Sequence, residues 1–265
     1  MKTKKILKII QPHTIFITLG FLLVMAFFHP LFIENKSMNQ NDVFQGIGSG
    51  QEARNFRQET GEEALWTNSM FSGMPAYLIN IYWSGDLIKH VQHIITLKFP
   101  SAAQVTILGF LSCYFMLIIF KVRPWLAFIG AIAFSFNTFS IISIEAGHIW
   151  KVRAIAYMPL VIGSVHMVIT QKKKLLSLGL LSFAVALEIQ ANHLQITYYL
   201  LLMLIIYGLF YLVDMIKSKK YSKLNNHIAL LILAGILGVG ANAGRIWTTL
   251  EYSIYSTRGP SELSS

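Results

Sequence analysis

Charge and cysteine are both scarce in this chain of 265 residues, and each shortage excludes a class of protein. Only 13% of the residues are charged and 54% are hydrophobic, giving a mean hydropathy of +0.55, whereas about a quarter of a soluble domain is charged. The single cysteine, Cys113, lies in an apolar run and has no intrachain disulfide partner. His-Glu-x-x-His and Gly-x-Ser-x-Gly motifs are absent, so metalloprotease and serine hydrolase readings lack their sequence signatures.

Long apolar runs are what the sequence has instead. Several reach about 18 residues, enough for a helix to cross a hydrocarbon core of about 30 Å. Lipid offers the backbone no hydrogen-bonding partner, and the period-two alternation of barrel strands is absent. We therefore expect an all-α polytopic integral membrane protein with about seven transmembrane helices. The predicted spans are residues 13–33, 102–120, 125–144, 154–170, 175–189, 196–216 and 228–243.

Basic residues mark alternate ends of these spans, which explains the net charge of +10 without invoking nucleic acid. Lysine and arginine gather in short cytoplasmic segments of multi-pass proteins. This bias places residues 1–12 in the cytoplasm and residues 34–101 outside it, as a large first extracytoplasmic loop. The final segment, residues 244–265, also falls outside. The odd number of spans favours an N-terminal portion of a longer protein.

The first extracytoplasmic loop contains the most polar stretch of the chain, residues 41–77. Its glycines Gly46, Gly48 and Gly50 predict a flexible loop. Farther along, residues 86–99 place isoleucine, leucine and valine on one helical face and lysine, histidine and glutamine on the other. That pattern is typical of a helix that lies in the membrane interface.

Several polar side chains share the extracytoplasmic side in this topology. Ionisable groups near a membrane are costly and are usually paired or functional, and we expect Glu188, just inside a span, to pair with one of the cations. A carboxylate can take the proton of an attacking hydroxyl, and cations can stabilise a departing phosphate. The same groups could equally anchor anionic lipid, and His193 could be a cap or hinge. The residues on this side are Asp42, Trp66, His148, Lys151, Arg153, His193, Glu251 and Arg258.

Five short motifs stand out along the chain: Asp42–Gln45, Gly61–Pro75, Gly147-His148, Asn192–Gln195 and Glu251–Gly259. They resemble motifs of the YfhO-like bacterial membrane proteins, in the form found in Bacteroidetes-type bacteria. These proteins are similar to the C-type glycosyltransferases (GT-C). The resemblance implies a multi-pass protein of the bacterial cytoplasmic (inner) membrane. It would take sugar from a polyprenyl-phosphate donor and deliver it to a polymer or lipid of the cell envelope on the extracytoplasmic side.

The resemblance also implies roles for individual residues. Asp42 would be the catalytic base, and His148, Lys151 and Arg258 would bind the donor phosphate. Trp66, Gly73, Pro75 and His193 would contact substrate. The acidic motif of the superfamily typically holds two carboxylates, whereas Asp42 stands alone after Asn41. No cofactor is certain from the sequence, and a divalent metal is possible but lacks the support of paired ligands. The expected partners are the polyprenyl-phosphate sugar donor, the envelope acceptor and membrane lipids, with no nucleic acid.

Two other functions remain open at the level of sequence. A transporter or flippase for a lipid-linked or anionic substrate would place ionisable or helix-breaking residues near the membrane midplane. Here the span centres carry almost no charge, although Gly235, Gly238 and Gly240 loosen the last span. A structural subunit of an envelope assembly would use the polar loop as a docking surface. Sugar transfer, substrate movement across liposomes and a co-purifying partner discriminate the three.

Overall fold

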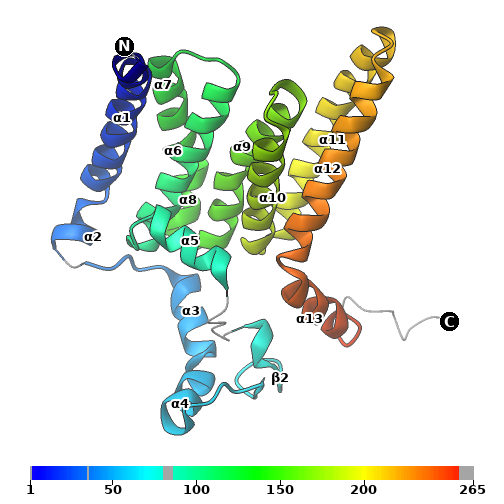
Figure 1. Ribbon diagram of the computed structural model, residues 1–265. Coiled ribbons are helices and arrows are strands. Elements are labelled where there is room, and N and C mark those ends of the chain that lie inside the picture. The colour runs from blue at the N-terminus through cyan, green and yellow to red at the C-terminus, as the bar shows by residue number, and fades with distance from the viewer. Residues whose placement is uncertain (1, 35, 80–85, 257–265) are drawn as a thin grey trace. The chain divides into compact units, whose positions relative to one another are not determined.

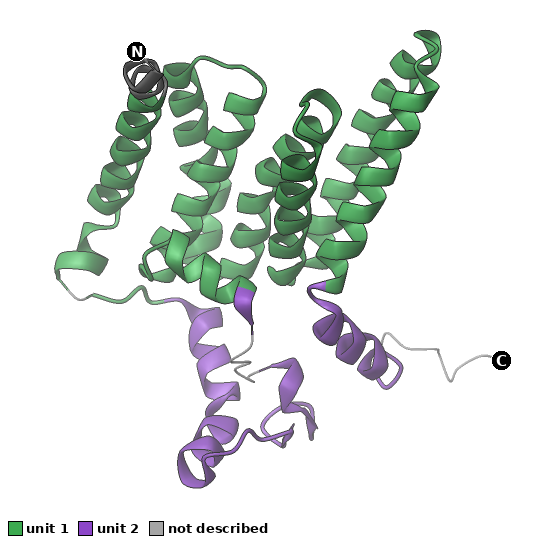
Figure 2. Ribbon diagram, in the orientation of Figure 1, with its two compact units in different colours: residues 1–39, 88–240 green, residues 40–87, 241–265 purple. Residues whose placement is uncertain are grey.

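The chain folds almost entirely into helices (Figure 1). The computed structural model describes residues 2–34, 36–79 and 86–256, with side chains from Ile10 onward. It divides into two compact units, shown in Figure 2. Unit 1 contains Met1–Asn39 and Ile88–Gly240, and unit 2 contains Gln40–Leu87 and Ala241–Ser265.

Unit 1 is a bundle of helices whose connections alternate between two ends. We call one the His148 end, where α8 and α10 end and α9 and α11 begin. The other, the Lys174 end, holds the turns that join α6 to α7, α9 to α10 and α11 to α12. The helices are α1 (Lys2–Phe27), α2 (His29–Ile33), α5 (Leu87–Ile95), α6 (Ser101–Ile119), α7 (Pro124–Ser135), α8 (Thr138–Glu145), α9 (Ile149–Thr170), α10 (Lys174–Gln190), α11 (Leu194–Lys217) and α12 (Tyr221–Gly240).

Five helices of the described chain are long and apolar enough to cross a membrane: α1 from Ile10, α6, α9, α11 and α12. The pair α7 and α8 makes a sixth if it is one bent span. Helix α10 coincides with the predicted fifth span, but it has 17 residues and is shorter than these. The fold is therefore that of an α-helical multi-pass membrane protein, and the count of seven spans stays a prediction.

The predicted third span corresponds to two helices, α7 and α8, bent by 41°. Asn137 lies at the break. Its side-chain oxygen accepts a hydrogen bond from the backbone N–H of Ser140 at 2.9 Å, and its amide nitrogen donates to the Phe134 carbonyl at 2.6 Å. Asparagine thus caps the start of α8 and satisfies a backbone carbonyl near the end of α7. The helix can break inside this apolar run because Asn137 supplies these hydrogen bonds to the freed backbone groups.

Small side chains allow α6 and α9 to pack closely. A Cβ atom at Gly163 of α9 would lie 3.0 Å from the Met116 Cα of α6. A Cβ at Gly109 of α6 would lie 3.7 Å from the Ala156 Cβ. In lipid, where the hydrophobic effect does not drive helices together, this close van der Waals contact is a main source of association.

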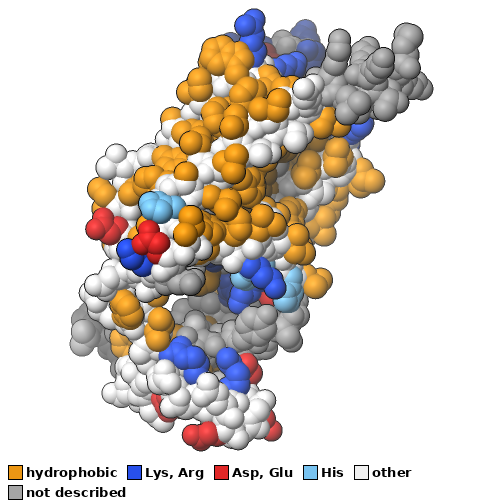
Figure 3. All heavy atoms as spheres, turned by 90° about the vertical axis from the view of Figure 1, so that its left-hand side faces the viewer, with side chains coloured by type: hydrophobic (Ala, Val, Ile, Leu, Met, Phe, Trp, Pro, Cys, Tyr) orange, Lys and Arg blue, Asp and Glu red, His pale blue; other side chains and the backbone are white. Residues whose placement is uncertain are grey.

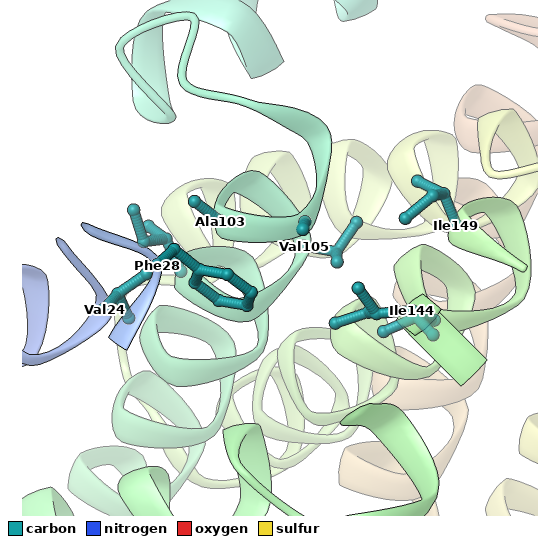
Figure 4. Packing of buried hydrophobic residues seen from close by; sticks show 9 residues of the cluster. Val24, Phe28, Ala103, Val105, Ile144 and Ile149 are labelled. Atoms are coloured by element: carbon teal, nitrogen blue, oxygen red, sulfur yellow. The ribbon is translucent and has the colours of Figure 1, made fainter. Parts of the chain in front are cut away.

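A hydrophobic cluster fills the bundle at the His148 end, drawn close up in Figure 4. Val24 of α1 and Phe28, which follows α1, lie beside Ala103 of α6, while Ile144 of α8 and Ile149 of α9 lie near Val105. This cluster therefore joins helices α1, α6, α8 and α9 at the end of the bundle where α9 begins.

Hydrophobic side chains also cover the outside of the bundle. Figure 3 shows them over most of the helical part of the face on the α1 side. Helix α11 exposes Leu202, Ile206, Leu209, Phe210 and Val213. Large apolar side chains on the outside of helices of this length suit contact with lipid chains.

Histidine–tyrosine hydrogen bonds join helices in the half of the bundle nearer the Lys174 end. His13 of α1 bonds to Tyr114 of α6 at 2.9 Å, and His166 of α9 bonds to Tyr207 of α11 at 2.7 Å. A third bond joins Tyr211 of α11 to His227 of α12, whose other ring nitrogen lies 2.8 Å from the Lys174 ammonium. Each of these histidines therefore has a partner on a neighbouring helix.

Unit 2 is mostly helical as well. Asp86 and Arg245 of α13 form an ion pair at 3.7 Å.

The glycines Gly46, Gly48 and Gly50, predicted to lie in a flexible loop, are instead in or next to α3, which corrects that expectation. Helix α4 ends at Gly61, whose φ of +75° is a left-handed conformation that glycine adopts readily. The elements are α3 (Asn41–Ser49), α4 (Gln51–Thr60), β1 (Trp66–Thr67), β2 (Met74–Pro75), the 3-10 helix η1 (Ala76–Leu78) and α13 (Ala243–Ser253).

Replacing Gly163 with leucine should force α6 and α9 apart. A side chain there meets the Met116 backbone, which cannot move aside as a flexible side chain would. We expect the free energy of unfolding in detergent to fall by about 1–3 kcal/mol, the range for overpacking. The matched control is Gly208→Leu on α11, where a Cβ meets nothing within 4 Å. Equal losses from the two substitutions would contradict this packing.

Candidate functional site

Asp42 lies in the first turn of α3 and is exposed. A carboxylate in the first turn of a helix interacts favourably with the backbone N–H groups that have no intrahelical acceptor. The exposure leaves its carboxylate accessible from solvent. Arg258, proposed from the sequence to bind phosphate, lies outside the described residues.

Trp66, Gly73 and Pro75 come together in unit 2. The two short strands pair antiparallel, with Trp66 opposite Pro75. Gly73 has a φ of +122°, and a Cβ there would lie 3.0 Å from the Trp66 indole, so only glycine fits both the backbone and the space. Pro75 is buried, whereas Trp66 is 55% exposed. The result is an accessible indole held over a glycine turn.

Glu52 of α4 holds this hairpin in place, a role that the sequence did not reveal. Its Oε2 accepts hydrogen bonds from the Thr67 hydroxyl at 2.7 Å and from the N–H groups of Asn68 and Ser69 at 2.8 and 2.9 Å. The bond from Thr67, followed by that from Asn68, lowers the pKa of Glu52 because hydrogen bonds favour the charged carboxylate. One side chain thus fixes the segment that begins with Trp66.

Two cations of unit 1 lie in the first turns of α9 and rest on aromatic rings. The Lys151 ammonium is 4.9 Å from the centroid of the Phe139 ring, and the Arg153 guanidinium is 4.6 Å from that of Trp150. Neither cation forms an ion pair with an acidic side chain among the residues that the structure describes. Neither positive charge is therefore neutralised by a carboxylate of the described chain.

The start of α9 adds its own positive field to these cations. His148 is the exposed N-cap residue, and Gly147 before it has a φ of +92°, which allows the sharp turn out of α8. Helix α9 is 22 residues long, and a helix N-terminus favours negative charge. His148 and Lys151 both lie at this start of α9.

The pKa of His93 in α5 is affected by the positive charges at this end of unit 1. Burial lowers its pKa, and the charges of Lys89 and Arg153 lower it further, because each opposes protonation of the imidazole. The neutral imidazole is therefore favoured near neutral pH. An anion bound nearby would counter this effect.

Glu188 differs from the expectation that it pairs with a cation. It is 2% exposed, and in the described chain it forms no ion pair. Its Oε1 accepts a hydrogen bond from the Thr197 hydroxyl at 3.0 Å, while its buried Oε2 has no hydrogen-bond partner. Buried atoms of three nearby residues also have no hydrogen-bond partner: Nε of Arg153, the hydroxyl of Tyr157 and Nδ1 of His193.

We refer to Arg153, Tyr157, Glu188, His193 and Thr197 as the Glu188 cluster. Sequence reasoning had named Arg153, Glu188 and His193 but missed Tyr157 and Thr197. The spacing of Arg153 and Tyr157, four residues apart on one helix face, was the available signal.

The predicted site residues thus divide between the two units: Asp42, Trp66, Gly73 and Pro75 belong to unit 2, and His148, Lys151 and His193 belong to unit 1. The described residues contain no group of three or more His, Cys, Asp or Glu side chains arranged to hold a metal ion. Neither group therefore has the ligands of a resident metal within the described chain.

The helices and their apolar surfaces define a multi-pass membrane protein. A family model described as "Bacterial membrane protein YfhO" matches residues 48–262. The chain therefore belongs to the YfhO family of bacterial membrane proteins. No curated protein and no solved structure matches it. The matched residues include both groups of site residues except Asp42.

Substituting Glu52 with glutamine should loosen the segment that begins with Trp66, because a neutral amide accepts weaker hydrogen bonds than a carboxylate. The amides of Asn68 and Ser69 should then exchange hydrogen faster. The exposed Glu59→Gln substitution on the same helix is the control and should leave these rates unchanged.

The same contact should depend on pH in a defined direction. The pKa of Glu52 in the folded chain lies below its ordinary value of 4.5. Its contribution to stability is therefore complete above pH 4.5 and is lost as the pH falls through the lowered pKa. Protection of the Asn68 and Ser69 amides that stays constant throughout this acid range would contradict the role of Glu52.

Proposed function

We propose that this protein is a glycosyltransferase of the bacterial cytoplasmic membrane. It would take a sugar from a polyprenyl-phosphate donor and transfer it to a cell-envelope polymer or lipid. We place the N-terminus in the cytoplasm and the His148 end on the extracytoplasmic side, because the Lys174 end carries Lys121, Arg123, Lys172, Lys173, Lys174, Lys217, Lys219, Lys220 and Lys223 in short turns.

The observation that carries the proposal is the start of α9. Lys151 rests on the Phe139 ring without a carboxylate partner in the described chain, and it lies at a helix N-terminus. A lipid-linked phosphate at the membrane surface has the charge and location that this arrangement suits. We assign the donor phosphate to His148, Lys151 and Arg258.

The proposed reaction needs a base and a leaving group. The acceptor hydroxyl attacks the anomeric carbon of the donor sugar and gives its proton to a carboxylate, for which we propose Asp42. The bond between the anomeric carbon and the phosphate oxygen breaks, and polyprenyl phosphate leaves with the electron pair. Cations lower the barrier because negative charge grows on the departing phosphate. Trp66, Gly73 and Pro75 would contact substrate, with the Trp66 indole as the stacking surface, as would His193.

The transporter reading is less well supported. Within the described spans the histidines of the Lys174 half each have a tyrosine partner on a neighbouring helix. Such satisfied pairs serve to hold helices together. A substrate pathway across the whole bundle would require unpartnered polar groups in this half as well.

Asp42→Asn should abolish transfer, because an amide cannot accept the hydroxyl proton. We expect the rate to fall by about a hundredfold or more, the usual contribution of a general base. The assay follows labelled sugar from polyprenyl phosphate into envelope acceptors in membranes containing the full protein. Glu62→Gln, an exposed carboxylate of the same unit, should behave as wild type. An Asp42→Asn protein with full activity would refute the assignment.

Lys151→Met should weaken donor binding, because it removes a charge-assisted contact with the phosphate. Such contacts contribute about 1.5–3 kcal/mol, so the KM for the donor should rise by roughly ten- to a hundredfold. Lys151→Arg keeps the charge and should restore most of the affinity. If methionine and arginine at this position give the same KM as lysine, the phosphate lies elsewhere.

A further inference from the structure

The Glu188 cluster contains polar groups that the proposed phosphate site does not use. Glu188 lies near the end of α10 and is 2% exposed, and one of its oxygens has no hydrogen-bond partner. A carboxylate removed from water in this way is costly unless a compensating group reaches it. Thr197 compensates only the other oxygen.

Tyr157 of α9 lies next to Glu188. It is 1% exposed and packs in one hydrophobic cluster with Leu187, which precedes Glu188 on α10, with Ala191, which follows α10, and with Ile196, which precedes Thr197 on α11. Its buried hydroxyl has no partner. Tyr157 is close enough to both Arg153 and Glu188 to interact with their charges. The phenol therefore belongs to the same polar group as the guanidinium and the carboxylate.

The unpartnered atoms define the chemistry of a ligand. The Glu188 oxygen needs a hydrogen-bond donor, the Arg153 Nε–H needs an acceptor, and the Tyr157 hydroxyl can serve in either role. A phosphate would satisfy Arg153 but would be repelled by Glu188, and an amine would be repelled by Arg153. Hydroxyl groups satisfy all three, because each one donates one hydrogen bond and accepts others.

We propose that Glu188, Tyr157 and Arg153 bind the hydroxyl groups of a sugar ring. This inference rests on the proposed function, and it identifies the sugar of the lipid-linked donor as the ligand. Lys151 and Tyr157 are six residues apart on α9, about 9 Å along the helix axis. The Glu188 cluster therefore lies about 9 Å farther along the axis of α9 than the proposed phosphate contact at Lys151.

Helix α5 covers this part of the bundle. Its Ile88 and Ile95 pack against the apolar cluster that contains Tyr157. A sugar held beneath α5 would be shielded from water, which strengthens hydrogen bonds to charged groups. The amphipathic character that suggested a helix in the membrane interface thus also gives α5 an apolar face to place over the site.

The test compares a bare lipid phosphate with three forms of the same lipid that each carry a different sugar. The full protein in nanodiscs is titrated with polyprenyl phosphate and with the same lipid carrying glucose, mannose or N-acetylglucosamine. We expect the wild type to bind at least one glycosylated form about tenfold or more tightly than the bare lipid phosphate. Glu188→Gln and Tyr157→Phe should each remove this preference and leave the affinity for polyprenyl phosphate unchanged.

Two controls separate binding from folding. Glu145→Gln changes an exposed carboxylate at the same end of the bundle and should retain the preference. Tyr157→Phe deletes a buried hydroxyl that has no partner, so its thermal unfolding midpoint should not fall. The isosteric Glu188→Gln substitution keeps an acceptor for Thr197.

The outcomes distinguish this site from the proposed function. A wild type with no preference for any of the three sugars overturns the site, as does a preference that survives in both variants. A wild type that prefers the glycosylated lipid but transfers no sugar supports the site and refutes the transferase. Transfer by a wild type whose two variants keep the preference refutes the site alone.

Discussion

A membrane interior supplies no water to satisfy polar groups, and the rest of this structure depends on how the chain meets that constraint. The backbone meets it by forming helices. At the break between α7 and α8, Asn137 supplies hydrogen bonds to both helices. Buried side chains must find partners on neighbouring helices or in a ligand.

The two halves of the bundle differ in how their buried polar side chains find hydrogen-bonding partners. Toward the Lys174 end, His13, His166 and His227 are each hydrogen-bonded to a tyrosine of another helix. At the His148 end, Glu188 and Tyr157 keep polar atoms without partners in the described chain. The first half is therefore suited to holding helices together, and the second to receiving a ligand. Lys151 and Arg153, at the start of α9, also lie at the His148 end.

The class of fold could be predicted from the sequence because it depends on residues that are neighbours in the chain. Long apolar runs predicted membrane helices, and the motif around Trp66 and Gly73 pointed to the family that the matched model identifies. The antiparallel contact of Trp66 with Pro75 follows from a turn within ten residues. Features of this kind depend on residues that are neighbours in the chain.

Features that depend on tertiary contacts could not be predicted in the same way. The ion pair expected for Glu188 is absent from the described chain, because Thr197 of α11 reaches its carboxylate instead. The role of Glu52 depends on a turn 15 residues away. Glycine content suggested a flexible loop around Gly46, yet the segment is helical. Helix propensity is a weak guide where packing decides.

The central claim is that the start of α9 faces the extracytoplasmic side, and labelling of introduced cysteines tests it most directly. The native Cys113 is buried and can be replaced by serine to give a background without thiols. Cysteine placed at His148 should react with a membrane-impermeant maleimide in intact cells, whereas cysteine placed at Lys172 should react only after permeabilisation. The reverse pattern would put the cations of α9 in the cytoplasm and contradict the account.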